Sequence, residues 1–205
     1  MDRHLKFWDR IARRYARQPV ADEASYQRKL DITREYLQAD MQLLEIGCGT
    51  GSTAIVHAPF VKHIRAVDVS ANMIAIAKQK AAELQINNID FEQALIDDVQ
   101  VETGSVDVVL ALSILHLLDD KESVIKRIYS MLKPGGLFIS NTACLGDFMK
   151  FYKYFGPIGS FLGVLPLVKV FSEAELLDCI QQAGFTIEQH WCPGRAKAVF
   201  VVARK

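Results

Sequence analysis

Two periodicities of apolar residues divide this chain. Up to about residue 40, apolar side chains recur at helical spacing. This pattern predicts one helix that ends before Pro19 and a second helix that begins after an N-cap at Asp22. From residue 42 onward, short apolar runs alternate with helical patterns, which predicts a mostly parallel β-sheet with helices on both faces.

The apolar runs predict seven strands, and the segments between most of them predict four helices. The strands are Gln42–Ile46, His63–Val67, Ile89–Glu92, Val106–Ala111, Leu137–Thr142, Thr186–Trp191 and Ala198–Ala203. The helices are Thr53–His57, Asn72–Leu84, Glu122–Leu132 and Glu173–Ala183. Because only a short turn separates the last two strands, we expect them to be antiparallel. The predicted fold class is α/β.

Composition and charge argue against several classes of function. The chain has 205 residues, is 50% hydrophobic and has a formal net charge of zero, which fits one folded domain and argues against broad nucleic-acid binding. Its four cysteines lack metal-ligand spacing, so we predict reduced thiols and no metal site. The charged N-terminus does not resemble a secretory signal, and the stretch Tyr154–Val168 is too short to span a bilayer. We expect a cytoplasmic protein.

The strongest chemical signal follows the first predicted strand, where Glu45 precedes glycines at positions 47, 49 and 51. Glycines at such a turn permit positive φ and let a ligand lie against the backbone. The spacing G-x-G-x-G differs from the dinucleotide fingerprint G-x-G-x-x-G. An acid beside the loop would repel a pyrophosphate and favour a ligand that carries a cation or an amine.

A second acid, Asp68, ends the next predicted strand. An acid at this place can accept hydrogen bonds from both hydroxyls of a ribose. The alternative is that Asp68 caps the following helix. Ser70 can fill that role itself, so we favour the ribose for Asp68.

Four ordered motifs resemble those of the class I S-adenosylmethionine-dependent methyltransferases. They are E-I-G-C-G-T-G, V-D-V-S-A-N-M, S-V-D-V-V and L-K-P-G-G, within roughly residues 40–142, and a weaker match lies within Phe171–Phe185. The similarity is closest to the small-molecule branch, which includes quinone-ring and phospholipid methyltransferases. It implies a Rossmann-like, doubly wound sheet of order 3-2-1-4-5-7-6 with strand 7 antiparallel. It also implies S-adenosylmethionine as cofactor and S-adenosylhomocysteine as product.

The resemblance assigns the glycine loop to the methionine portion of the cofactor, with Glu45 near its amino end. Asp68 would bind the ribose, and Met73 would pack on the adenine. The family's usual acid after the third strand is missing, because Leu95 stands there; Asp97 could replace it, or backbone groups nearby could hold the adenine. The predicted cofactor-binding residues are Tyr15, Glu45, Gly47, Cys48, Gly49, Gly51, Asp68, Val69, Met73, Ile96, Asp97, Leu112 and Ser113.

Chemistry is expected at the carboxyl end of the fourth strand, because ligands of open α/β sheets bind beyond the strand ends. Leu112 and Ser113 follow that strand directly. His116 is the only histidine near this edge and could act as a base at neutral pH; alternatively it packs against the following turn. Tyr15 could contact the cofactor from the first helix or could be a packed core residue. The other histidines are predicted to be structural.

We expect a single domain, 1–205, whose cofactor-binding core comprises residues 40–143 and 171–205. Two additions would choose the acceptor: the N-terminal helices (1–39) and an apolar, aromatic insertion (144–170). The insertion could be a lid, a patch that touches a membrane surface transiently, or a dimer surface. The expected activity is methyl transfer to a small apolar, aromatic or lipid-like acceptor by a monomer or homodimer. The alternative is a cofactor-binding regulatory protein that has lost catalysis.

Overall fold

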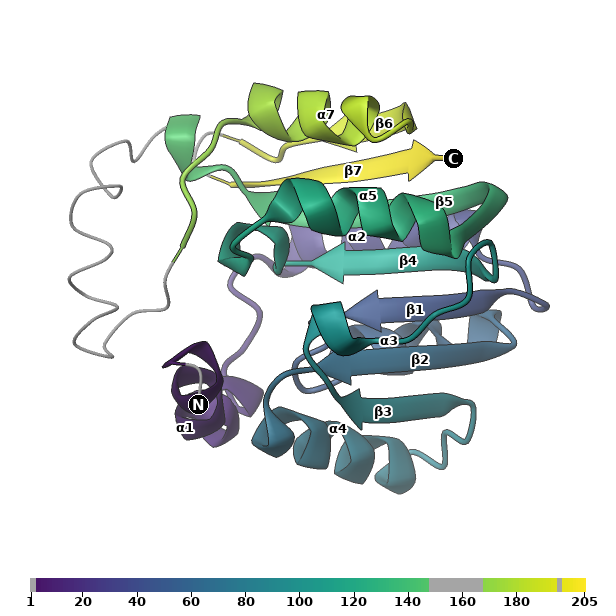
Figure 1. Ribbon diagram of the computed structural model, residues 1–205. Helices are drawn as coiled ribbons and strands as arrows, with labels where there is room; N and C mark the ends of the chain where they lie inside the picture. The colour runs from purple at the N-terminus through teal and green to yellow at the C-terminus, as the bar shows by residue number, and fades with distance from the viewer. Residues whose placement is uncertain (1–2, 148–167, 195–196) are drawn as a thin grey trace. The chain divides into compact units, whose positions relative to one another are not determined.

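The computed structural model describes residues 3–147, 168–194 and 197–205 (Figure 1). Seven strands form one sheet of order β3-β2-β1-β4-β5-β7-β6. The strands are β1 (Gln42–Ile46), β2 (His63–Asp68), β3 (Ile89–Gln93), β4 (Val106–Leu112), β5 (Leu132–Ala143), β6 (Thr186–Trp191) and β7 (Ala198–Arg204). β7 is antiparallel to both β5 and β6. The predicted α/β class, strand order and antiparallel strand 7 are therefore confirmed.

Six α-helices and four short 3₁₀ turns accompany the described strands. The helices are α1 (Arg3–Ala16), α2 (Glu23–Tyr36), α3 (Ser52–His57), α4 (Ala71–Glu83), α5 (Lys121–Met131) and α7 (Glu173–Gln182), and the turns are η1 (Ala58–Phe60), η2 (Ile96–Asp98), η3 (Leu115–Leu117) and η4 (Leu145–Asp147). The Asp22 side chain accepts a hydrogen bond from the Ser25 N–H, which confirms the predicted N-cap of α2. In the described ranges, no helix is long and apolar enough to cross a membrane.

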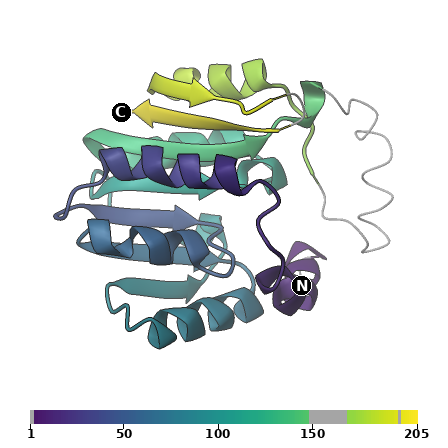
Figure 2. The same ribbon diagram turned by 180° about the vertical axis from the view of Figure 1, so that it is seen from behind.

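The chain divides into two compact units, Met1–Gln100 and Val101–Lys205. The first unit contains β1, β2 and β3, which pair in parallel, and α4 packs against β2 and β3. Within this unit α1 packs on α4 and lies beyond the carboxyl ends of β2 and β3 (Figures 1 and 2). The strand side chains of this core are almost fully buried, among them Leu43, Leu44, Ile46, Ile64, Ala66, Val67 and Phe91.

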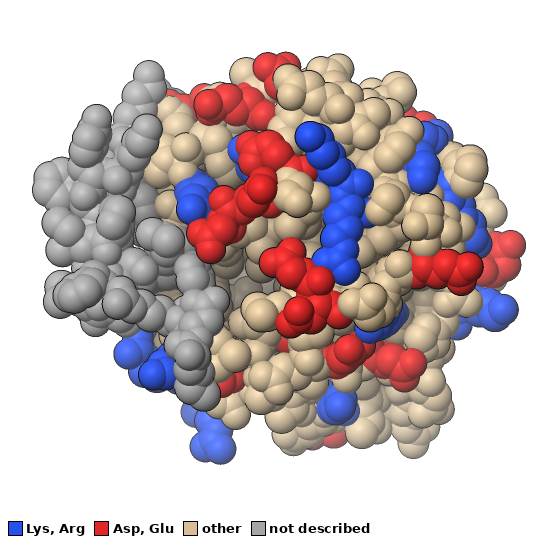
Figure 3. Space-filling model, viewed as in Figure 1, with Lys and Arg blue, Asp and Glu red and all other residues tan. Residues whose placement is uncertain are grey.

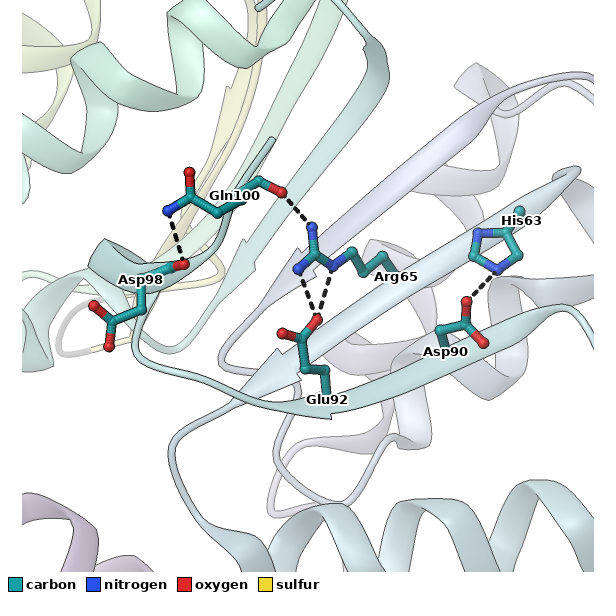
Figure 4. A network of polar contacts seen from close by, with 6 residues as sticks. All are labelled: His63, Arg65, Asp90, Glu92, Asp98 and Gln100. Atoms are coloured by element: carbon teal, nitrogen blue, oxygen red, sulfur yellow. Dashed lines mark hydrogen bonds and ion pairs between the residues drawn. The ribbon is translucent and has the colours of Figure 1, made fainter. Parts of the chain in front are cut away.

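A polar network covers the other face of β2 and β3 (Figure 4). The Arg65 guanidinium donates to Glu92 Oε2 at 2.7 and 2.9 Å and to the Gln100 carbonyl at 2.6 Å. His63 and Asp90 form a second cross-strand contact of 3.1 Å. The loop after β3, which contains only the turn η2, lies over this face where a βα repeat would place a helix.

The second unit contains β4 to β7 with α5 and α7 (Figure 2). The four residues from Val108 to Ala111 in β4 are completely buried, as expected of a strand covered on both faces. β5 begins at Leu132, five residues before the predicted start at Leu137, because Leu132 pairs with Val106 before the register shifts. Periodicity could not reveal this early pairing, since a lysine, a proline and two glycines separate the two parts of the strand.

Charged side chains of both signs are interspersed on the face shown in Figure 3, with no continuous basic surface among its described residues. This distribution agrees with the zero net charge. Most of the predicted insertion 144–170 lies outside the described residues, including Phe148, Phe151 and Phe161, whose aromatic side chains suggested a lid. At its far end the Lys169 N–H donates to the His116 carbonyl at 2.8 Å.

Candidate functional site

The glycine loop joins β1 to α3 through three left-handed backbone conformations. The φ angles are 68° at Gly47, 54° at Gly49 and 72° at Gly51. A Cβ at Gly51 would lie 2.8 Å from atoms of both Ala77 and Phe91, so this glycine lets the loop pack closely on α4 and β3. A Cβ at Gly49 would meet nothing within 4 Å. The backbone at Gly49 is therefore accessible to a ligand.

Asp68, at the end of β2, is bonded to this loop. Its Oδ2 accepts the Gly49 N–H and its Oδ1 accepts the Ser70 N–H, both at 2.9 Å. Ser70 caps α4 as expected, since its Oγ accepts the Met73 N–H at 3.1 Å. Asp68 is nevertheless not free: each oxygen already accepts one backbone donor and keeps further acceptor capacity for a ligand hydroxyl. Desolvation raises the pKa of Asp68, and these backbone hydrogen bonds oppose the rise.

Glu45 is a buried acid with one oxygen that is unpaired among the described residues. It is 2% exposed, and its Oε2 has no hydrogen-bond partner in the part of the chain that the structure describes. The Ala54 N–H, in the first turn of α3, hydrogen-bonds to the carboxyl group. Burial raises the pKa of Glu45 to about 8, and the charge of Asp68 adds to the shift. A buried acid with an unpaired oxygen is suited to a ligand that brings a positive charge or a donor.

Two tyrosines from the N-terminal helices interact electrostatically with these acids. Desolvation raises the pKa of Tyr15, and the negative charge of Asp68 adds to the rise, although Tyr15 is 45% exposed. Tyr26 of α2 hydrogen-bonds to the Thr53 side chain, and the nearby Glu45 contributes to its raised pKa, again after desolvation. Neither Tyr26 nor Thr53 is among the predicted cofactor-binding residues, although Tyr26 belongs to the N-terminal helices that were expected to cover the strand ends and Thr53 follows the glycine loop closely.

The residues expected to hold the adenine are less clearly gathered into a site than the glycine loop and its two acids. Met73 is 2% exposed on α4, and Leu95 is 46% exposed. Ile96 begins η2, and Asp97 within that turn is exposed. The Ala94 N–H donates to the Asp68 carbonyl at 3.0 Å and fixes the start of this loop. The role of Asp97 stays a prediction.

Comparison with known proteins identifies the family to which these features belong. A family model described as a methyltransferase domain matches residues 37–192, which is more than half of the chain. The chain belongs to this methyltransferase family. The class I resemblance of the sequence motifs and the implied cofactor, S-adenosylmethionine, are thereby confirmed.

Individual relatives agree with this assignment. The methyltransferase is 27% identical over 193 residues to the malonyl-[acyl-carrier protein] O-methyltransferase of Priestia megaterium, covering 91% of this chain and 67% of the relative. It is 31% identical over 145 residues to the demethylmenaquinone methyltransferase of Oceanobacillus iheyensis, covering 67% and 61%. The chain thus spans about two thirds of the length of these two relatives. An S-adenosylmethionine-dependent methyltransferase from Mesorhizobium loti has the same fold, with a TM-score of 0.74 at 20% identity over 90% of this chain and 99% of that one.

The second unit of the methyltransferase contains the residues that were expected from the sequence at the carboxyl end of β4. Leu112 ends β4, and Ser113 follows it with a φ of 61°, which is unusual for a residue other than glycine. The Ser113 N–H donates to the Asn141 carbonyl at 2.7 Å, and the Asn141 amide approaches Ser113 Oγ at 3.4 Å. Strained backbone of this kind persists where the surroundings enforce it and clusters at functional sites. Sequence reasoning missed Asn141, which lies inside an apolar strand.

His116 lies in η3, three residues after Ser113. Its Nδ1 is buried and has no partner among the residues described, and desolvation lowers its pKa to about 4. The imidazole is therefore neutral at pH 7. Its unpaired ring nitrogen can accept a hydrogen bond or a proton from the substrate, or donate a hydrogen bond to it, depending on the tautomer. Its role as a base stays a prediction.

Proposed function

We propose that this methyltransferase transfers the methyl group of S-adenosylmethionine to a small apolar, aromatic or lipid-like acceptor. One observation carries the cofactor part: Glu45 is buried with an unpaired Oε2, and the charge of Asp68 adds to the rise of its pKa that burial causes. S-adenosylmethionine carries an ammonium group and two ribose hydroxyls, which match the two acids. When bound, it supplies an electrophilic methyl group on a sulfonium.

The residues of the first unit hold and orient the cofactor in this proposal. Glu45 pairs with the ammonium group, Asp68 accepts the ribose hydroxyls, and the open backbone at Gly49 lets the methionine portion lie against the loop. Met73 packs on the adenine from α4. Tyr15 covers the cofactor from α1 and limits access of water.

Ser113, Asn141 and His116 act on the acceptor in this proposal. Ser113 and Asn141 position it by hydrogen bonds, and the neutral His116 accepts the proton that a hydroxyl acceptor loses as its oxygen bonds to the methyl carbon. An acceptor of the quinol or phenol type fits this chemistry. The similarity to a demethylmenaquinone methyltransferase supports an acceptor related to quinones.

Two features favour the alternative of a regulatory protein that binds the cofactor without catalysis. Leu95 replaces the acid that the family usually offers to the adenine, and His116 has no orienting partner at Nδ1 within the described ranges. Turnover distinguishes the two functions, because both require cofactor binding.

Calorimetric titration with S-adenosylmethionine, S-adenosylhomocysteine and NADH tests the cofactor first. We expect micromolar affinity for the first two ligands and none for NADH. A coupled assay for S-adenosylhomocysteine release, run with a demethylated quinol, a catechol, a malonyl thioester and phosphoethanolamine, then tests the acceptor. Binding without turnover on any of these would favour the regulatory alternative, and folded protein that binds neither adenosyl ligand would refute the proposal.

A further inference from the structure

The helix α1 packs on α4 and is hydrogen-bonded to the start of that helix through Asp9. Asp9 lies in the middle of α1, and its Oδ1 accepts the Ser70 hydroxyl at 2.5 Å and the Asn72 N–H at 3.1 Å. The Asp9 carbonyl also accepts the Asn72 side-chain amide at 3.1 Å. Three hydrogen bonds from one residue therefore join α1 to the first turn of α4, across more than 60 positions of sequence.

The position of this contact is electrostatically favourable. α4 is 13 residues long, and its first-turn N–H groups have no partners within the helix. Asp9 places a carboxylate there, where the helix dipole stabilises negative charge. Ser70 relays the contact, since its Oγ accepts from the Met73 N–H while its hydroxyl donates to Asp9. Such chains of hydrogen bonds strengthen one another.

The same contact reaches the predicted ribose site through Ser70. The Ser70 N–H donates to Asp68 Oδ1 at 2.9 Å, so one serine is bonded to the cofactor acid and to α1 at once. Farther along α1, Tyr15 packs edge-on against Trp8, with ring centroids 6.2 Å apart. Because Trp8 precedes Asp9 directly, the hydrogen bonds that hold Asp9 also hold the part of α1 that carries Trp8 and, packed against it, Tyr15.

We propose that Asp9 is a positioning residue that fastens α1 onto α4 and so keeps Tyr15 over the bound cofactor. Opening of this contact then controls the release of S-adenosylhomocysteine. The inference rests on the proposed function, because it needs a cofactor beneath α1. It goes beyond that function in assigning cofactor retention to a residue that need not touch the cofactor.

The test compares Asp9→Ala with Asp9→Asn, Asp31→Ala and the wild type. The asparagine keeps an oxygen at the position that accepts both side-chain bonds. Asp31 offers a matched control, because it lies on α2 and accepts only exposed bonds from Gln27 and Arg34. Stopped-flow displacement gives the dissociation rate of S-adenosylhomocysteine. Hydrogen exchange measures the protection of α1.

Asp9→Ala removes two hydrogen bonds, so we expect the ligand to dissociate about tenfold faster and α1 to exchange faster while the β1–β3 core keeps its protection. Asp9→Asn should restore both properties, and Asp31→Ala should leave them unchanged. In the double variant Asp9→Ala/Tyr15→Phe, the free energy of S-adenosylhomocysteine retention should fall by less than the sum of the two single effects. Both substitutions act through the contact of Tyr15 with the cofactor.

The outcomes separate this inference from the proposed function. If the wild type binds S-adenosylhomocysteine and Asp9→Ala releases it at the wild-type rate, the inference is wrong and the function stands. The inference is also wrong if Asp9→Ala speeds hydrogen exchange of α1 without speeding S-adenosylhomocysteine dissociation. It is wrong as well if the effects of Asp9→Ala and Tyr15→Phe on dissociation are fully additive. Wild-type protein that binds no S-adenosylhomocysteine removes the basis of both.

Discussion

Glu45→Gln gives the sharpest test of the cofactor site, because it removes one titratable group and nearly preserves the shape of the side chain. With a pKa of about 8, Glu45 is ionised in only about a tenth of the free molecules at pH 7. A ligand ammonium beside the unpaired Oε2 favours the ionised form, so binding must expel the proton. The apparent affinity of wild type should therefore rise about tenfold per pH unit below pH 8.

The cofactor's own amino group limits this rise at high pH. An α-amino group titrates near pH 8, and its neutral form cannot pair with Glu45. The affinity of wild type should thus reach a maximum at about pH 8. Below it, each bound cofactor should release close to one proton. Glu45→Gln should show no rise from pH 6 to pH 7.5 and no proton release.

Calorimetry in phosphate, imidazole and Tris at each pH measures the proton count, since the buffers differ in their heats of ionisation. 5′-Methylthioadenosine is the control ligand, because it lacks the amino-acid portion and should bind without releasing a proton. If S-adenosylmethionine binds tightly with no proton release at pH 7, Glu45 does not pair with the ammonium group. Equal pH slopes for wild type and Glu45→Gln would refute the reasoning as well.

Three substitutions examine other parts of the site. Gly51→Ala should lower the melting temperature and weaken cofactor binding, because a Cβ there would lie 2.8 Å from the Phe91 ring in a left-handed conformation; wild-type melting would contradict the close approach. Asp68→Ala should weaken S-adenosylhomocysteine binding by about 1–3 kcal/mol in calorimetry, and unchanged affinity would reject the ribose role. His116→Asn should lower kcat on a hydroxyl acceptor but spare cofactor affinity, and full activity would exclude the base.

The helices and strands could be predicted from the sequence because their determinants are local, whereas the order of the strands followed from the resemblance of the motifs to a known family. Buried parallel strands produce continuous apolar runs, as Val106–Leu112 does, and the caps at Asp22 and Ser70 are short-range hydrogen bonds between neighbours in sequence. The glycine spacing and the acid at the end of β2 also lie in short segments. Each of these patterns can be recognised in one sequence without an alignment.

The remaining site features arise from contacts between distant segments, which no local pattern encodes. The bond from Ser70 to Asp9 spans 61 residues, and that from Ser113 to Asn141 spans 28. The unpaired Oε2 of Glu45 depends on which groups surround it in three dimensions. Sequence reasoning could name Glu45 from its place beside the glycines, but its raised pKa required the packed structure.

Two buried groups in the first unit titrate with opposite effects on stability, and Glu45→Gln can separate them. His57 is 0% exposed, neither ring nitrogen has a partner among the described residues, and burial lowers its pKa to about 4. The neutral His57 contributes fully to the free energy of unfolding above its usual pKa of 6.5, and this contribution is lost as the pH falls toward 4. The loss between pH 7 and pH 5 is about 2 kcal/mol.

The raised pKa of Glu45 has the reverse consequence. The neutral acid is tolerated in the folded state below its usual pKa of 4.5, and stability is lost as the pH rises toward 8. Acidification from pH 7 to pH 5 therefore returns about 2.5 kcal/mol through Glu45, which offsets the loss of about 2 kcal/mol through His57. Urea denaturation of ligand-free wild type should thus change little over this range, whereas Glu45→Gln should lose about 2 kcal/mol. If the variant and the wild type respond alike to acid, Glu45 is already ionised in the folded protein. Its unpaired oxygen would then be a charge that the fold tolerates without a ligand, and the proton-coupled binding argued above would have no basis.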